Sequence, residues 1–348
     1  MTGRVLEPSL PASERDTGET AALAIDDLVV TLVGDGRRVP VVTGVDLRVP
    51  ARSTLGLVGE SASGKSLTCL AVMRLLDRRR LSVESGSIRL GGRELLELSE
   101  DEMRAVRGNE IGMIFQDPMT SLDPAFTAGQ QIASVVRRHT GAGRRGARTR
   151  ALELLSLVGI GDPGRRADQY PHQFSGGMRQ RIMIAMAIAG EPRLLIADEP
   201  TTALDATTQA QIIELIRDLT ETLGMATIIT THDLGVVAEL CDRVSVMYAG
   251  QIVEHTETAA LFHHPRHPYT ERLLAGLPRV GRPLELLGIP GAPPRPGHFA
   301  AGCRFAPRCT HVREPLCTAA PPPLHELGAG RSARCARVAE LALPGVGA

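Results

Sequence analysis

The stretch that decides the fold is Gly59-Glu60-Ser61-Ala62-Ser63-Gly64-Lys65-Ser66. It follows the apolar run 55–58, which predicts a buried strand, and precedes residues 67–76, whose apolar spacing predicts a helix. A glycine-rich turn between a strand and a helix is typical of a phosphate-binding P-loop, because backbone N–H groups then point inward at the positive end of the helix. An ordinary glycine turn is the alternative. The fact that Lys65 is the only lysine in the chain favours the P-loop.

We therefore expect a nucleoside triphosphate to bind here, with Lys65 reaching its β and γ phosphates and Ser66 contacting a Mg²⁺ ion. The residues assigned to nucleotide binding in this segment are Gly59, Glu60, Ser61, Ala62, Ser63, Gly64, Lys65, Ser66 and Leu67.

The composition narrows the class of protein. A chain of 348 residues with 43% hydrophobic residues predicts one large or two modest domains with ample core. Its net charge of zero argues against a nucleic-acid surface, which is usually basic. The longest apolar stretch, 182–189, is far shorter than the roughly 20 residues that cross a bilayer, and the N-terminus has no apolar signal core, so we expect a cytoplasmic protein.

Strand and helix patterns alternate along the chain. Residues 23–32 and 39–49 predict an antiparallel strand pair, 88–90 and 111–115 predict further strands, and 94–107 predicts a helix. In residues 125–189 the apolar residues recur mainly at helical spacing. Strands return at 194–197 and 226–230, separated by a helix over 208–223, which is typical of a mainly parallel α/β sheet.

An arginine-rich stretch lies inside the helical region, over residues 137–150. Two interpretations are open: an exposed, solvated loop or a site for an anion. The small residues around the arginines favour the loop.

Polar groups follow three of the predicted strands. Asp198 and Glu199 end the strand at 194–197, His232 follows the strand at 226–230, and Gln116 follows the strand at 111–115. Because the ends of parallel strands present ligand-binding groups, we expect Asp198, Glu199 and His232 beside the P-loop. Asp198 would hold Mg²⁺ through water, Glu199 would be the general base for an attacking water, and His232 would contact the γ-phosphate.

A second glycine segment precedes the apolar run 182–189. Ser175 can cap the following helix, while Gly176 and Gly177 let a phosphate of another molecule approach the helix terminus. Simple helix capping is the alternative.

Together these segments resemble the ATP-binding cassette (ABC) family over residues 22–256. The matching motifs, in the family's order, are Walker A at Gly59–Ser66, the Q-loop at Gln116, the signature at Ser175, Gly176 and Gly177, Walker B at Leu194–Asp198, the D-loop at Ala203–Asp205 and the switch His232. The resemblance implies a P-loop NTPase with a RecA-like α/β core, an antiparallel β subdomain and an inserted helical subdomain at about 118–190. It also implies ATP hydrolysis, with Ser66, Gln116 and Asp198 as ligands of Mg²⁺, and two cassettes that pair across the nucleotides.

The chain departs from the family at two places. Phe174 and Met178 flank the signature where the commonest sequence has leucine and glutamine, although the central Ser-Gly-Gly is intact. Leu32 stands near the end of the first strand, where the family usually stacks an aromatic ring on adenine. The base would lose that stacking contact.

The segment 257–348 follows the cassette, and residues 1–21 precede it as a flexible tail. The runs 267–270, 289–291 and 302–309 resemble the extension of ATPase subunits of dipeptide and oligopeptide importers, with nickel importers as close relatives. This implies a peripheral protein on the cytoplasmic face of the membrane that works with a second cassette, two membrane permease subunits and, indirectly, an extracytoplasmic solute-binding protein. The alternatives are a soluble cassette ATPase acting on nucleic acid or ribosomes, an importer ATPase for nickel or another solute, and a regulatory cassette without turnover.

Four of the six cysteines lie in the extension, at Cys303, Cys309, Cys317 and Cys335. Four thiolates satisfy either tetrahedral zinc or a cubane cluster, and unligated thiols are the third possibility. The importer resemblance, whose extension carries such cysteines, implies a [4Fe-4S] cluster, with zinc as the alternative. We expect a structural role for the centre and no part in it for Cys69 and Cys241.

Overall fold

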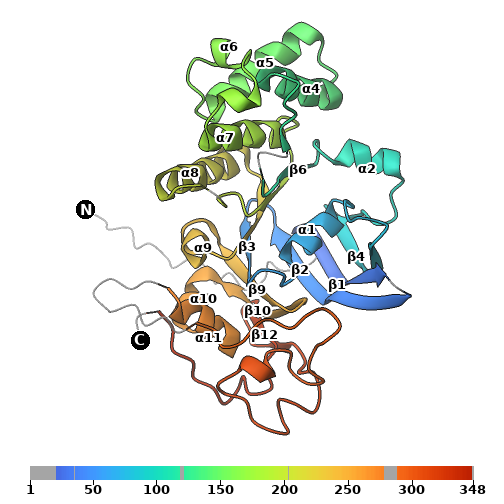
Figure 1. Cartoon of the computed structure of the whole chain (residues 1–348), viewed down its shortest axis with the longest axis vertical. Helices are drawn as coiled ribbons and strands as arrows, with labels where there is room; N and C mark the ends of the chain where they lie inside the picture. The colour runs from blue at the N-terminus through green and yellow to red at the C-terminus, as the bar shows by residue number, and fades with distance from the viewer. Residues whose placement is uncertain (1–20, 35, 118–120, 203, 278–287, 347–348) are drawn as a thin grey trace, which may run out of the picture.

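The computed structural model describes residues 21–34, 36–117, 121–202, 204–277 and 288–346. Three sequence predictions fall outside these residues: the tail over 1–20, the segment 118–120 after the Q-loop glutamine, and Ala203. Figure 1 shows helices α4–α7 at one end of the molecule, two sheets in the middle and the C-terminal extension at the other end.

The N-terminal half of the chain contributes an antiparallel sheet with the strand order β2-β1-β4-β5. The predicted strand pair is confirmed, because β1 and β2 pair along their length. The short strand predicted at 88–90 is the end of a longer strand, since the serine-rich residues before it also pair with β1. The strands are β1 (Ala21–Gly34), β2 (Arg37–Pro50), β4 (Leu81–Leu90) and β5 (Arg93–Glu94).

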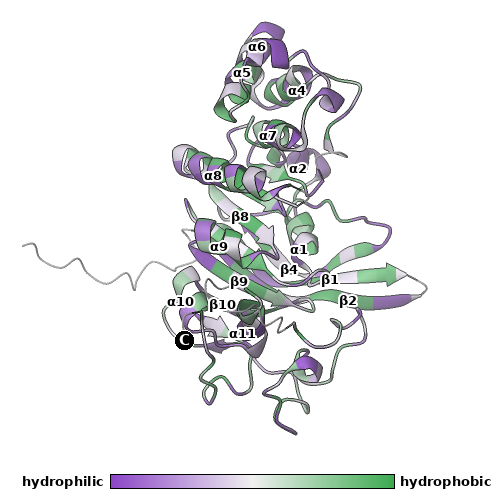
Figure 2. Ribbon diagram, turned by 60° about the vertical axis from the view of Figure 1, so that its left-hand side comes forward, coloured by the Kyte–Doolittle hydropathy of each residue, from purple (hydrophilic) through white to green (hydrophobic). Residues whose placement is uncertain are grey.

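The central sheet has the order β11-β12-β10-β9-β3-β8-β7-β6. The strands from β9 to β6 run parallel, and β3, β6, β7 and β8 are buried along their whole length, as the continuous apolar runs predict for a sheet covered on both faces. Figure 2 shows hydrophobic residues on β8 and β9 of this sheet. The strands are β3 (Thr54–Val58), β6 (Ile111–Ile114), β7 (Leu194–Asp198), β8 (Ala226–Thr231), β9 (Arg243–Tyr248), β10 (Gln251–Glu257), β11 (His325–Glu326) and β12 (Ser332–Ala333).

The helices confirm most of the predicted helical spacing. Glu94 lies in β5 and not in a helix, so the helix predicted over 94–107 is shorter and starts at the capping box of Ser99 and Glu102. The helices are α1 (Lys65–Val72), α2 (Glu100–Val106), α4 (Ala128–Thr140), α5 (Arg144–Leu157), α6 (Pro163–Arg166), α7 (Gly176–Ala187), α8 (Ala206–Leu223), α9 (Leu234–Leu240), α10 (Thr258–His263) and α11 (Pro268–Ala275).

The arginine-rich stretch 137–150 is mostly exposed, as expected, but the prediction of a loop is wrong, because most of the stretch is helical. Thr127 and Gln130 form a capping box that starts α4, and Gly141, in the left-handed conformation, ends it. Helix α5 then buries Ala147 and Ala151 against its neighbours. Arginine is a good helix former, so a buried face of small residues is enough to order this stretch.

The C-terminal extension packs directly on the central sheet. Strand β12 pairs with β10, and β11 pairs with β12, so two short strands widen the sheet at its edge. The rings of Tyr248, Tyr269 and Phe305 are fully buried and contact one another, with centroids 4.6 to 5.4 Å apart. One apolar cluster therefore joins β9, α11 and the segment after residue 300.

Glu254 on β10 ties the start of α11 to the sheet. Its side chain is completely buried, and its two carboxylate oxygens accept the backbone N–H groups of Arg266 and His267 at 2.8 and 2.9 Å. Burial raises the pKa of this carboxyl. The two hydrogen bonds satisfy the N–H groups of the two residues that directly precede α11.

We expect Glu254→Ala to lower the free energy of unfolding by about 2 to 4 kcal/mol, because a buried and a half-buried N–H group lose their acceptor. Urea unfolding measures this difference. Glu257→Ala, at an exposed position of the same strand, is the matched control and should change stability by less than about 0.5 kcal/mol. Equal effects of the two substitutions would contradict the role given to Glu254.

Candidate functional site

The loop 59–64 connects β3 to α1, as predicted, and it approaches the neighbouring strand β9 very closely. A Cβ atom on Gly59 would lie 2.1 Å from the carbonyl oxygen of Met247. Gly64 has a φ of +112°, a conformation that side chains rarely adopt. Both glycines are therefore required by the path of the loop.

Lys65 begins α1 and folds back over the loop. Its Nζ donates hydrogen bonds to the carbonyl oxygens of Gly59 at 2.7 Å and Glu60 at 3.1 Å. The side chain is buried, and burial lowers its pKa, although the carboxylates of Glu199 and Asp198 act in the opposite direction. A cation thus lies beside the concave side of a glycine loop at a helix start.

Asp198 at the end of β7 lies next to Ser66. The Ser66 hydroxyl donates to the Asp198 carboxylate at 2.9 Å, and the Thr230 hydroxyl of β8 donates to the same oxygen. Asp198 is buried. Hydroxyl and carboxylate oxygens are the ligands that Mg²⁺ prefers, so this pair fits the predicted magnesium site.

The other predicted strand-end residues gather around Glu199. Its carboxylate accepts from Gln116 Nε2 at 3.3 Å and lies 3.4 Å from Nδ1 of His232. Thr202 donates a further hydrogen bond at 2.9 Å. The Glu199 side chain is 13% exposed, whereas that of His232 is 61% exposed. The structure therefore brings groups from the ends of β6, β7 and β8 to one edge of the sheet.

A cavity of about 300 Å³ lies beside the glycine loop. Gln116 and Glu199 line it together with the loop, and Ser175, Gly176 and Gly177 are not among the described residues that do. The full lining is Val41, Ser61, Ala62, Ser63, Gly64, Lys65, Ser66, Leu67, Gln116, Glu199, Ala249, Pro294, Pro296 and Phe299. The last three come from the extension and were missed by the sequence reasoning, which assigned no role to that stretch.

Ser175 caps α7, as predicted, by accepting the backbone N–H of Met178 at 3.4 Å. Helix α7 is also joined to the loop after β7, because Gln180 Nε2 donates to the carbonyl oxygen of Pro200 at 2.7 Å. The second glycine segment thus lies at the start of α7, outside the cavity beside the first, and Gly177 packs closely on the Thr208 side chain.

Arg308 links the extension to the glycine loop. Its guanidinium donates to both carboxylate oxygens of Glu60, at 2.7 and 3.0 Å, and only 6% of the side chain is exposed. The same group donates to the carbonyl oxygens of Pro290 at 2.7 Å and Gly291 at 3.2 Å. The Tyr269 hydroxyl accepts the backbone N–H of Glu60 at 2.8 Å. No sequence motif indicated that Arg308 or Tyr269 contacts Glu60.

The four cysteines of the extension line one small cavity of about 20 Å³. Burial raises the pKa of Cys309 and of Cys335 to about 11. Among the described residues, however, no group of three or more His, Cys, Asp or Glu side chains is placed to hold a metal ion. The predicted iron–sulfur or zinc centre is therefore not supported by this geometry. A cavity needs about 10 to 15 Å³ to hold one water molecule, so this cavity has room for little more than one. A four-iron cluster therefore does not fit unless the thiols move apart.

The remaining cysteines lie elsewhere. Cys69 is buried in α1, and Cys241, whose pKa burial raises to about 12, packs beside β3. Neither lines the cysteine cavity.

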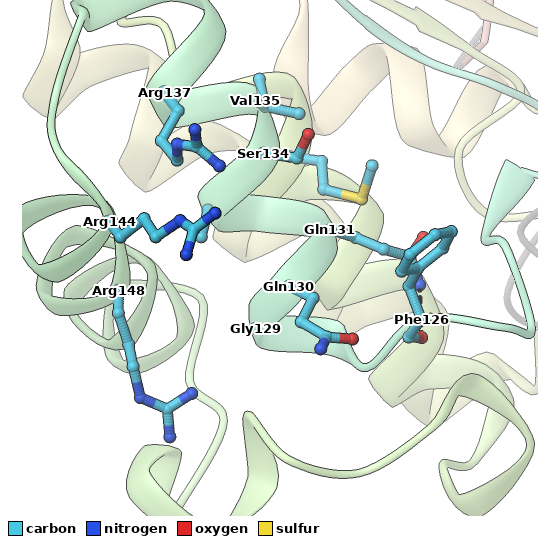
Figure 3. A pocket seen from close by; sticks show the side chains of 11 residues that line it. Phe126, Gly129, Gln130, Gln131, Ser134, Val135, Arg137, Arg144 and Arg148 are labelled. Carbon is cyan, nitrogen blue, oxygen red and sulfur yellow. Dashed lines mark hydrogen bonds between the residues drawn. The ribbon is translucent and has the colours of Figure 1, made fainter.

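A larger hollow of about 540 Å³ lies between α4 and α5. Figure 3 shows Arg137, Arg144 and Arg148 along one side of it and Phe126 at the far end. Arg148 is paired with Asp168 through two hydrogen bonds of 3.0 Å, and Phe126 is 52% exposed.

Within the described ranges, no helix is long and apolar enough to cross a bilayer.

Family models match two parts of the chain. Residues 42–202 match the ABC transporter family, and residues 253–317 match the C-terminal region of oligopeptide and dipeptide transporters.

Curated relatives match most of the chain. A putative peptide import ATP-binding protein of Brucella abortus is 49% identical over 314 residues, which cover 90% of this chain and 94% of the relative. A probable peptide ABC transporter ATP-binding protein of Sinorhizobium fredii is 50% identical over 321 residues, covering 92% and 96%.

Solved structures match the cassette part. The ATP-binding cassette MJ0796, in a dimeric post-hydrolysis state bound to ADP and Pi, is 27% identical with a TM-score of 0.61 and covers 68% of this chain and 98% of its own. The cbiO1 protein of Clostridium perfringens, part of the ABC transporter complex cbiONQ, is 25% identical with a TM-score of 0.60, covering 70% and 91%.

We expect Arg308→Met to lower the free energy of unfolding by about 2 to 4 kcal/mol, because the Glu60 carboxylate and the carbonyl oxygens of Pro290 and Gly291 lose their shared donor. Arg313→Met is the matched control. Arg313 pairs with Glu340 on the surface of the same extension, with half of its side chain exposed, so its loss should cost less than about 1 kcal/mol. Chemical unfolding compares the two variants, and a smaller effect at Arg308 than at Arg313 would show the link to be unimportant.

Proposed function

The chain belongs to the family of ATP-binding proteins of oligopeptide and dipeptide ABC transporters, and from that premise we propose that it hydrolyses ATP to drive the import of peptides. The observation that carries the proposal is that one chain matches both the cassette and the C-terminal region of peptide transporters. The second match also favours transport over action on nucleic acid, because cassettes alone power many different machines.

The arrangement around the glycine loop supports a role for each polar residue. We assign Lys65 to the β and γ phosphates and the backbone N–H groups of the loop to the remaining phosphate oxygens. Ser66, Asp198 and Gln116 would hold Mg²⁺, which neutralises charge on the phosphates when bound. Their positions fit, since Ser66 and Asp198 are in hydrogen-bonding contact and Gln116 lines the same cavity.

Hydrolysis requires a base that receives a proton from the attacking water. We assign this role to Glu199, whose carboxylate lies in the cavity wall and is held by Gln116 and Thr202. His232 lies 3.4 Å from that carboxylate and is exposed, so it can turn toward a γ-phosphate.

A second cassette completes the proposed active site. Ser175, Gly176 and Gly177 lie at a helix start outside the cavity of their own chain, and we assign their N–H groups to a nucleotide held by a partner cassette. We propose that this chain pairs with an identical or homologous ATPase subunit beneath two permease subunits, at the cytoplasmic face of the membrane. An extracytoplasmic solute-binding protein would deliver the peptide.

We also propose that Cys303, Cys309, Cys317 and Cys335 bind one metal centre, because all four thiols line a single cavity. Thiolate ligands lose their protons when a metal binds, and a bound cation would offset the burial that now raises the pKa of Cys309 and Cys335. Because the described residues do not place three or more of these thiols to hold a metal ion, the thiols would rearrange when the centre binds. The [4Fe-4S] cluster implied by the importer resemblance requires the thiols to separate first.

In the transporter reconstituted with its membrane subunits, Glu199→Gln should bind ATP normally and hydrolyse it about 10² to 10⁴ times more slowly, because the base is lost while the hydrogen bonds are kept. Lys65→Ala should lose ATP binding, because it removes the charge opposite the phosphates. Nucleotide binding, phosphate release and peptide uptake are measured on the same preparations.

Three outcomes of this experiment are decisive. Wild-type turnover by Glu199→Gln would refute the assignment of the base. Full ATP affinity in Lys65→Ala would refute the phosphate site. Hydrolysis by the wild-type complex without uptake of any peptide would refute the proposed cargo.

For the cysteines, we expect the full chain purified under anaerobic conditions to contain one metal centre, and Cys317→Ser to lose it. Elemental analysis and visible absorption identify the centre. Iron and sulfide with a brown chromophore indicate the cluster, whereas one zinc without colour indicates a single ion. A folded chain that contains neither metal contradicts the proposal. Cys241→Ser is the matched control and should keep the metal.

A further inference from the structure

The lining of the cavity beside the glycine loop contains two chemically different sets of residues. The loop and Lys65 are polar, and Val41, Ala249 and three residues of the extension, Pro294, Pro296 and Phe299, are apolar. Phe299 is the one aromatic residue among the described residues of the lining. A nucleoside triphosphate has the same division, with charged phosphates at one end and a flat base at the other.

The segment that carries Phe299 is held against β2. Gly297 packs so closely on Val39 that a Cβ atom there would lie 3.1 Å from the valine side chain. Val39 is paired in register with Leu32 of β1. The extension thus covers the strand pair at the position where Leu32 stands in place of an aromatic residue, and Leu32 itself does not line the cavity.

The ring of Phe299 is fixed from one side by Arg304. The Arg304 guanidinium carbon lies 4.0 Å from the ring centroid, in a cation–π contact. The same guanidinium donates to the carbonyl oxygen of Ala249 and, at 3.2 Å, to the Thr43 hydroxyl. Arg304 therefore covers one face of the ring and anchors it to β2 and to the turn after β9.

The start of the same segment is anchored to the glycine loop. Arg308 donates to the carbonyl oxygens of Pro290 and Gly291 and to the carboxylate of Glu60. The wall that carries Phe299 and the loop that would hold the phosphates are thus parts of one hydrogen-bonded unit.

We propose that Phe299 is the residue on which the nucleotide base stacks, so that the extension completes the nucleotide site of its own chain. This inference rests on the proposed function, since it requires that the loop binds the phosphates. Stacking tolerates different bases because every base has a π-face, so Phe299 raises the affinity for ATP and for GTP alike. Arg304 and Arg308 are positioning residues that hold the ring over the cavity.

The test compares two probes, ATP and inorganic triphosphate, by calorimetry on the purified full chain. Phe299→Ala should bind ATP about tenfold more weakly and triphosphate as the wild type does, because triphosphate has no base. Phe299→Leu should show the same selective loss, while its apolar side chain keeps the packing under Arg304. Phe299→Tyr keeps a ring and should retain the affinity for ATP.

Val312→Ala is the matched control, because Val312 is an exposed apolar residue of the same extension outside the cavity. It should bind both probes like the wild type. Unchanged ATP affinity in Phe299→Leu and Phe299→Ala would overturn the inference, and so would an equal loss of both probes. A wild-type chain that binds neither probe would overturn the phosphate site itself, and the inference with it.

Discussion

The close approach of the loop 59–64 to strand β9 is the constraint on which the rest of the site depends. Gly59 leaves no room for a side chain against the Met247 carbonyl oxygen, and the backbone of the loop is joined to the same region by a 2.8 Å hydrogen bond from Gly250 to Ser63. The loop therefore has one path between β3 and α1. That path fixes Lys65 and Ser66, and with them the distance to Asp198 on the next strand but one.

The sequence predicted the parts of the site that depend on local order. Asp198, Glu199 and His232 each follow a short buried run, and parallel strands bring their ends to one edge of a sheet whatever the loops between them do. The cap at Ser175 was likewise readable from its neighbours. For Asp198, Glu199 and His232, the position of the preceding strand was enough to predict the edge of the sheet at which the side chain lies.

The parts that the sequence did not predict depend on distant contacts. The arginine-rich stretch is helical because small residues of α5 pack on neighbouring helices. This packing is not visible in the local sequence, which favoured a solvated loop. Phe299 and Arg308 lie in a proline-rich segment without a periodic pattern, so nothing in their own neighbourhood indicated that they face the glycine loop. The only signal was indirect, namely the missing aromatic residue at Leu32.

The two hydrogen bonds between Glu60 and Arg308 join residues that are 248 positions apart, so they form late in the synthesis of the chain. At about 5 to 20 residues per second, the ribosome makes Arg308 roughly 12 to 50 s after Glu60. During this interval the cassette emerges with the wall of its cavity still missing. A nascent or truncated chain that ends before Pro294 thus lacks the three cavity-lining residues of the extension, Pro294, Pro296 and Phe299.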